Sequence, residues 1–125
     1  MNHERHYTLE QANAALEFVG ERVERLRAAR VQLGDEEARE ALAEAGPQNG
    51  GGEAGRQVSA AFLDLRSALT DLQEMEIVLR DLERGLVDFP ALRDGREVYL
   101  CWEAGEDEIE FWHDTDAGYG GRRPL

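Results

Sequence analysis

The sequence contains no lysine, and each of its 14 basic residues is an arginine. A Schiff-base enzyme needs a lysine amine, and a P-loop site needs a lysine beside the phosphates, so both are excluded. The arginines are outnumbered by 27 acidic residues, which gives a formal net charge of −13. Because such a surface repels phosphate backbones and anionic lipids, we expect no nucleic-acid partner and no membrane partner.

Cysteine is almost as scarce, since Cys101 is the only one. A single cysteine cannot form an internal disulfide, which is typical of proteins in the reducing cytoplasm. The first residues lack the apolar core of a signal peptide, and no apolar run approaches the roughly 18 residues of a membrane span. We therefore expect a cytoplasmic protein, and its 125 residues suit a single domain with one modest core.

Catalytic and cofactor motifs are missing as well. The sequence has no Cys-x-x-Cys or His-x-x-x-His zinc pair, no dinucleotide-binding fingerprint, no nucleophile elbow and no kinase pattern. We therefore assign no cofactor, no metal and no catalytic residue from motifs, and we expect that the protein is not an enzyme.

The chain does contain two long helical patterns. In residues 8–45, a capping-box signature at Thr8 is followed by apolar residues at alternating steps of three and four. A second pattern covers residues 53–84, and a glycine-rich turn at residues 48–52 separates the two. We predict that the helices pair as a long, antiparallel, coiled-coil-like hairpin. A narrow apolar seam seldom hides all its surface within one hairpin, so we also expect a homodimer.

After Gly85 the apolar period changes from 3.6 residues towards 2, which predicts β-strands. We expect a small antiparallel meander over residues 86–113 and an irregular tail over residues 114–125. The predicted fold is therefore α+β: a single domain over residues 1–125, with a long helical hairpin and a small C-terminal antiparallel sheet.

Cys101 and His113 lie in this C-terminal part and could form a nucleophile pair or half of a zinc site. If the strands close through a two-residue loop, Val98 faces His113 and Cys101 lies on the other face of the sheet. In that register the two side chains diverge, and Cys101 is interpreted as a packed thiol. A three-residue loop would reverse the relation, but it would also break the apolar face.

Several polar and aromatic side chains remain as candidates for binding a ligand or a partner. They are Asp88, Trp102, Glu106, His113, Asp116 and Arg122. The acids with His113 could bind a hard metal ion, or they could only cap turns. Arg122 could hold a carboxylate or phosphate, or it could fasten the tail to the acidic sheet.

Two functions are consistent with these observations. The first is a non-catalytic interaction or scaffold protein, which self-associates through its helical hairpin and binds a protein partner. The alternative is a small metal- or ligand-binding protein or enzyme, with a site around His113 and the nearby acids.

The run from Asp81 to Trp102 closely resembles family 2203 of the bacterial domains of unknown function. The segment from Gly105 to His113 and the opening residues 7–13 also resemble that family. The resemblance covers essentially the whole chain. It implies a small, uncharacterised, cytoplasmic bacterial protein, and it implies no particular activity, cofactor or site residue.

Overall fold

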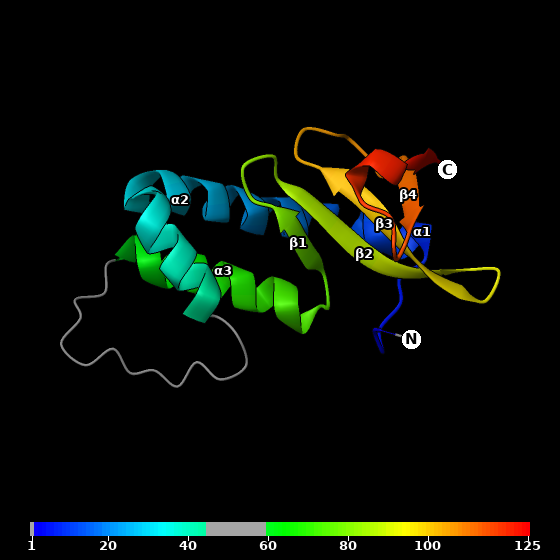
Figure 1. The fold of residues 1–125 in the computed structure, drawn as a ribbon, viewed down its shortest axis with the longest axis horizontal. Helices are drawn as coiled ribbons and strands as arrows, with labels where there is room; N and C mark the ends of the chain where they lie inside the picture. Colours follow the sequence, from blue (N-terminus) through cyan, green and yellow to red (C-terminus); the bar gives the residue numbers. More distant parts are fainter. Residues whose placement is uncertain (1, 45–59) are drawn as a thin grey trace.

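The structure is a computed structural model that describes residues 2–44 and 60–125 (Figure 1). Its elements are α1 (Leu9–Ala14), α2 (Leu16–Glu44), α3 (Ala60–Glu74), β1 (Val78–Asp81), β2 (Leu86–Arg93), β3 (Arg96–Glu103), β4 (Phe111–Asp114), the 3-10 turn η1 (Tyr119–Gly121) and β5 (Arg123–Pro124). The fold is α+β, as predicted. No helix within the described ranges is long and apolar enough to cross a membrane. The glycine-rich turn predicted at residues 48–52 lies outside the described residues.

The first predicted helix, residues 8–45, is broken into shorter pieces. Its start is confirmed, because Thr8 and Gln11 form a capping box with two hydrogen bonds of 3.0 Å. The helix is interrupted at Ala15, and α2 then kinks at Gly34, where φ is 81°. Glycine adopts this φ without the steric cost that a Cβ would add. The straight part of α2 therefore ends at Gly34, and the structure does not contain the long helical hairpin that we expected.

The second predicted helix, residues 53–84, ends at Glu74. Glu76 has a φ of 60°, which leaves the helical conformation, and β1 follows directly. The spacing of Leu79 and Leu82 continues the helical stripe, but Leu79 pairs with Val87 of β2, and Leu82 lies in the turn after β1. Tertiary pairing has overridden the local pattern here, as it often does for short apolar segments.

The five strands form one antiparallel sheet in the order β1-β2-β3-β4-β5. β2 and β3 make a long hairpin closed by Asp94 and Gly95, which both have positive φ as a tight hairpin turn requires. β2 and β3 lie within residues 86–113, where the period of 2 predicted strands, and β4 extends one residue beyond that range, to Asp114. The tail expected to be irregular contributes β5, which pairs with β4 through Phe111 and Trp112.

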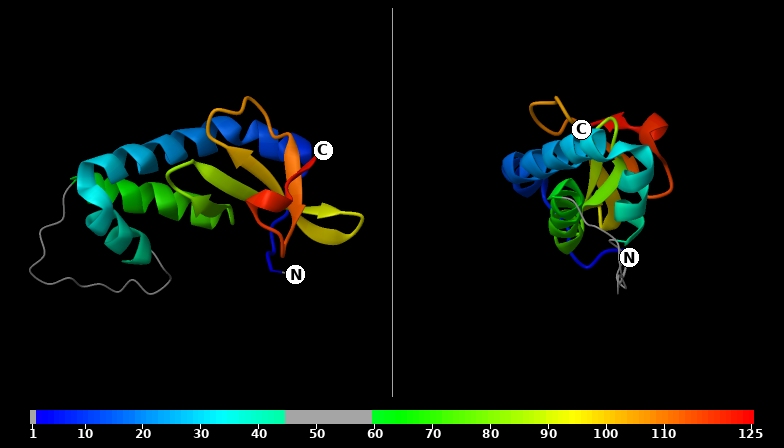
Figure 2. Two further views of the ribbon diagram at one scale, coloured as in Figure 1. Left: turned by 45° about the horizontal axis from the view of Figure 1, so that its top comes forward. Right: turned by 90° about the vertical axis from the view of Figure 1, so that its left-hand side faces the viewer.

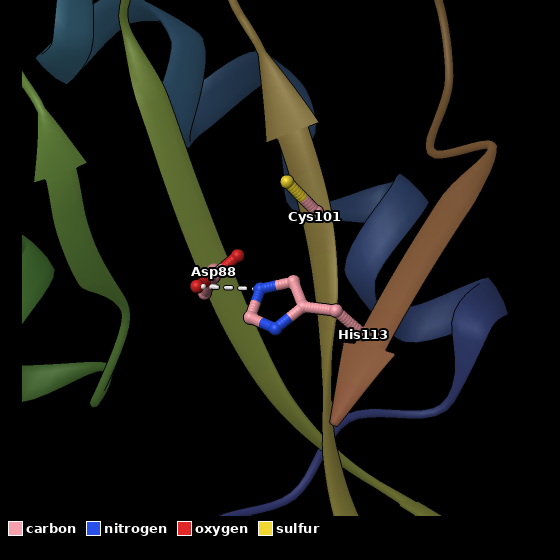
Figure 3. A group of neighbouring side chains, drawn as sticks. All are labelled: Asp88, Cys101 and His113. Carbon is pink, nitrogen blue, oxygen red and sulfur yellow. Dashed lines mark hydrogen bonds and ion pairs between the residues drawn. The ribbon is translucent and has the colours of Figure 1, made fainter. Parts of the chain in front are cut away.

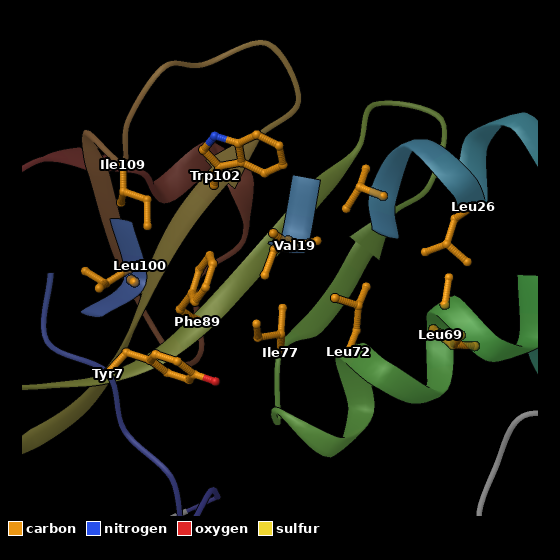
Figure 4. Close-up of a cluster of buried hydrophobic side chains, with 14 of the residues drawn as sticks. Tyr7, Val19, Leu26, Leu69, Leu72, Ile77, Phe89, Leu100, Trp102 and Ile109 are labelled. Atoms are coloured by element: carbon orange, nitrogen blue, oxygen red, sulfur yellow. The ribbon is translucent and has the colours of Figure 1, made fainter. Parts of the chain in front are cut away.

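The core lies between the helices and one face of this sheet. α2 and α3 lie side by side, and α1 with the start of α2 lies over the sheet (Figure 2). Figure 4 shows side chains from the helices and the strands meeting in one cluster. The most buried side chains of the cluster include Val19, Leu26, Leu65, Leu72, Val87 and Phe89, each 0% exposed.

The pairing of β3 with β4 differs by one residue from the predicted pairing. His113 lies opposite Tyr99, whereas the two-residue loop placed it opposite Val98. The actual connection is seven residues long, from Ala104 to Glu110. Because successive side chains of a strand point to opposite faces, this shift brings His113 to the face that carries Cys101.

Candidate metal centre

Three potential metal ligands meet on the second face of the sheet. Asp88 on β2 lies directly opposite Cys101 on β3, and His113 comes from the next strand, β4 (Figure 3). One ligand atom of each residue lies within 4.8 Å of the others. All three residues are buried, with exposures of 1%, 1% and 2%. The prediction that Cys101 and His113 diverge is therefore wrong, and the one-residue difference in register is the reason.

Both ring nitrogens of His113 face hydrogen-bond acceptors. Nδ1 lies 2.8 Å from the carbonyl oxygen of Asp114, and Nε2 lies 3.0 Å from Oδ2 of Asp88. The hydrogen bond to Asp88 raises the pKa of His113, and it outweighs burial, which lowers it. If Nε2 loses its proton, Nδ1 still donates to the Asp114 carbonyl, and the lone pair of Nε2 becomes available to a metal ion. Metal-binding histidines usually donate their other ring N–H in this way.

The two oxygens of the Asp88 carboxylate differ in their hydrogen bonding. Oδ2 accepts hydrogen bonds from Arg80 Nε at 2.7 Å and from His113. Oδ1 is buried and has no N–H or O–H donor among the described residues, and the Cys101 thiol, a weak donor, interacts with this carboxylate. A buried carboxylate oxygen without a strong donor raises the free energy of the folded state, and a bound cation would remove that cost.

Cys101 is a protonated thiol in this environment. Burial is the main cause that raises its pKa to about 12, and the charge of Asp88 adds to the effect. A thiol with this pKa is a poor nucleophile at neutral pH, which argues against a cysteine–histidine catalytic pair. Coordination to a metal ion, by contrast, deprotonates a thiol outright.

The three residues also line a cavity of about 400 Å³. One wall comes from β1 and the turn after it, and it includes Arg80 and Arg84. The other wall is formed by residues 115–119 of the tail. Arg84 reaches across between the walls, because its guanidinium lies 4.0 Å from the ring centroid of Tyr119. A cavity of this size accommodates a small molecule.

Of the remaining predicted site residues, Asp116 lines this cavity, whereas Glu106, Arg122 and Trp102 are not among its lining residues. Glu106 and Arg122 form an ion pair of 2.9 Å with each other. The charge of Arg122 lowers the pKa of Cys101, and its buried Nε is also without a partner in the described part of the chain. Trp102 lies on the opposite face, in the core, and donates its indole N–H to the Glu106 carbonyl oxygen at 2.9 Å.

Sequence reasoning missed Cys101, Arg80 and Arg84. Cys101 was set aside because a two-residue loop was assumed. Pairing Leu100 with Trp112 would have placed both tryptophans on the core face and given the observed register. The helical stripe places Arg80 and Arg84 in a helix, although the β-branched pair Ile77 and Val78 favours a strand.

Comparison with known proteins gives a family and nothing more specific. No curated protein and no solved structure matches this chain. A family profile described as "Uncharacterized conserved protein (DUF2203)" matches residues 5–125, which include every residue of the candidate metal centre. This match confirms the family that the sequence resembled. The chain belongs to the DUF2203 family.

Proposed function

We propose that this protein binds a divalent transition-metal ion of the zinc type through Asp88, Cys101 and His113. The observation that carries the proposal is the meeting of a carboxylate oxygen, a thiol sulfur and an imidazole nitrogen within 4.8 Å. Zinc takes these three kinds of ligand in proteins. Three protein ligands leave one position of a tetrahedral site open, as in catalytic zinc centres, and the cavity gives an exogenous ligand access to it.

The contacts around the three residues support this proposal. Metal-binding histidines usually donate their second N–H to a carbonyl or carboxylate, and metal-binding carboxylates keep hydrogen bonds of their own. Asp114 provides the first kind of contact to His113, and Arg80 provides the second kind to Asp88. A metal ion bound by His113 Nε2 and Asp88 Oδ1 would leave both contacts in place.

The donor set also favours a borderline ion over a hard one. Calcium and magnesium prefer oxygen ligands only, whereas a thiolate and an imidazole suit zinc, cobalt or copper. We therefore infer a zinc-type ion, and not the hard metal that the turn acids suggested.

Titration of the metal-free, untagged protein with Co²⁺ and Zn²⁺ tests the proposal. We expect a single ion per chain and a Co²⁺ spectrum with a thiolate charge-transfer band. Cys101→Ser removes that band, and His113→Gln weakens binding by at least about a hundredfold. Asp116→Asn is the matched control, because Asp116 lines the same cavity but is no proposed ligand. A wild-type protein that folds and binds neither ion contradicts the proposal.

The scaffold function and the homodimer stay predictions, and the structure weakens one reason for them. We expected the helical seams to leave apolar surface for a second copy. Leu9 is 40% exposed, but many seam residues are instead buried within one chain, including Val19, Val23, Leu26, Leu65, Leu69 and Leu72, none of which is more than 7% exposed. The cytoplasmic location and the protein partner likewise stay predictions.

A further inference from the structure

When a metal ion binds, the negative charge of Asp88 is balanced by the ion and no longer by the side chains around the cavity. Without the ion, the Asp88 carboxylate is shared between the guanidinium of Arg80 and the ring of His113. A divalent ion held by the Asp88 carboxylate, the Cys101 thiolate and a neutral His113 forms a cluster without net charge, since two negative ligands balance the ion. Arg80 then keeps its positive charge beside a neutral cluster.

Arg80 is placed to use that charge on a ligand. It bonds Asp88 through Nε at 2.7 Å, and its guanidinium lies 4.9 Å from the ring centroid of Tyr99. Its side chain is 41% exposed, and it lines the cavity. The Arg80 side chain also interacts with the Tyr99 hydroxyl. A guanidinium has five N–H donors, so groups remain for a further acceptor, and their planar geometry fits a carboxylate.

The other charged groups of the cavity do not add to this positive charge. Arg84 bonds both carboxylate oxygens of Glu103, with distances of 3.0 and 3.3 Å, so its charge is balanced. Asp81 and Asp116 line the cavity as well, and both are acids. These acids repel a dianion such as phosphate more strongly than a ligand with a single negative charge.

We infer that the metal-loaded protein binds a small molecule through its carboxylate group, with one oxygen on the metal ion and the other on Arg80. The inference rests on the proposed metal site and adds the chemical class of its ligand. The cavity of about 400 Å³ limits that ligand to a small molecule.

Titration of the Co²⁺-loaded protein with acetate, acetamide and inorganic phosphate tests this inference. The visible bands of the bound cobalt ion report directly on its fourth ligand. Increasing acetate concentration is expected to shift the bands until the shift reaches a plateau. Acetamide, which has a similar shape and no charge, is expected to leave them unchanged, and phosphate is expected to bind more weakly than acetate.

Two variants and a control identify the groups responsible. Arg80→Gln is expected to weaken acetate binding at least about tenfold, because it removes a charge-assisted hydrogen bond. Glu103→Gln is expected to strengthen acetate binding about two- to fivefold, because it leaves the charge of Arg84 unbalanced. Arg93→Gln makes the same charge change as Arg80→Gln on an exposed side chain of β2 that does not line the cavity, and it is expected to have no effect.

The outcomes separate this inference from the proposed function. If cobalt binds and acetate leaves its spectrum unchanged, the carboxylate inference is overturned and the metal site stands. The proposed ligand class is also overturned if phosphate binds more tightly than acetate, or if acetamide binds as tightly as acetate does. If no cobalt binds, the proposed function itself fails. If Arg80→Gln loses the metal ion, Glu103→Gln decides alone, and unchanged or weaker acetate binding then overturns the inference.

Discussion

At the scale of single residues, Asp88 connects three neighbouring strands. Its carboxylate bonds Arg80 of β1 and His113 of β4, and it faces Cys101 of β3. The carboxylate and the imidazole are both buried, with side-chain exposures of 1% and 3%. A buried ion pair adds little net stability over an apolar pair, but removing one partner leaves the other charge uncompensated.

Replacing Asp88 by asparagine is therefore expected to destabilise the metal-free protein by about 3 kcal/mol. The loss is measured by urea unfolding followed by circular dichroism. The control is Asp116→Asn, which removes the same charge from an exposed position of the cavity wall. A midpoint equal to that of the wild type would show that Asp88 does not hold these strands together.

A second residue-scale prediction concerns Gly85, in the turn between β1 and β2. Its φ is 68°, and an added Cβ would lie 2.6 Å from the Cβ of Ala104 and 3.1 Å from Cγ1 of Val23. Gly85→Ala is expected to cost about 3 kcal/mol, from backbone strain together with overpacking. Gly95→Ala is the control: φ is 78° there, but nothing lies within 4 Å of the added Cβ. Its expected cost is about 1 kcal/mol, from strain alone.

At the scale of elements, two carboxylates hold the N-terminal segment against the sheet. Glu97 accepts hydrogen bonds from the backbone N–H groups of Asn2 and His3 at 2.9 and 3.0 Å, and it lies 2.9 Å from His6 Nε2. Glu76 accepts from the next two N–H groups, at 3.1 and 3.2 Å. The segment thus satisfies its backbone donors through side chains of distant elements and not through a strand ladder.

This arrangement predicts acid release of the N-terminal segment. Burial raises the pKa of Glu97, but the hydrogen bonds from His6, Asn2 and His3 outweigh it and place the pKa below the ordinary value of 4.5. A carboxyl whose pKa is lower in the folded state stabilises that state above the unfolded-state pKa. The contribution is lost as the pH falls through the folded-state pKa.

The measurement is hydrogen exchange at the amides of Asn2 and His3, relative to those of the core, in mildly acidic buffers down to pH values below 4.5. Protection is expected to disappear below that value in the wild type. Glu97→Gln is expected to lack this pH dependence and to have little protection at neutral pH. Protection that persists through the whole range would contradict the role of Glu97.

At the scale of the whole molecule, the two faces of one sheet have different tasks. One face packs against the helices and holds the apolar core. The other carries Asp88, Cys101 and His113 under the tail that follows β4. Because the three ligands come from three strands, they meet only when the sheet has formed, so metal binding and folding should be coupled.

The coupling gives a prediction about thermal stability. A ligand that binds only the folded state stabilises it by about 2.7 kcal/mol at a free concentration of 100 Kd. The Tm of the wild type is therefore expected to rise with added Zn²⁺ and to fall back after chelation. The Tm of Cys101→Ser should respond much less. An equal rise in both proteins would show that zinc acts elsewhere on this acidic chain.

The sequence by itself determined the features that depend on neighbouring residues. The capping box at Thr8, the strands after Gly85, the α+β class and the family all follow from short-range patterns. Only the tertiary structure decided where the last helix ends and how β4 pairs with β3. The connection before β4 is fixed by a hydrogen bond of 2.8 Å from Ile109 N to Asn13 Oδ1, a residue 96 positions away. Since a one-residue change in register moves every side chain of a strand to the other face, that distant contact helps decide whether His113 meets Asp88.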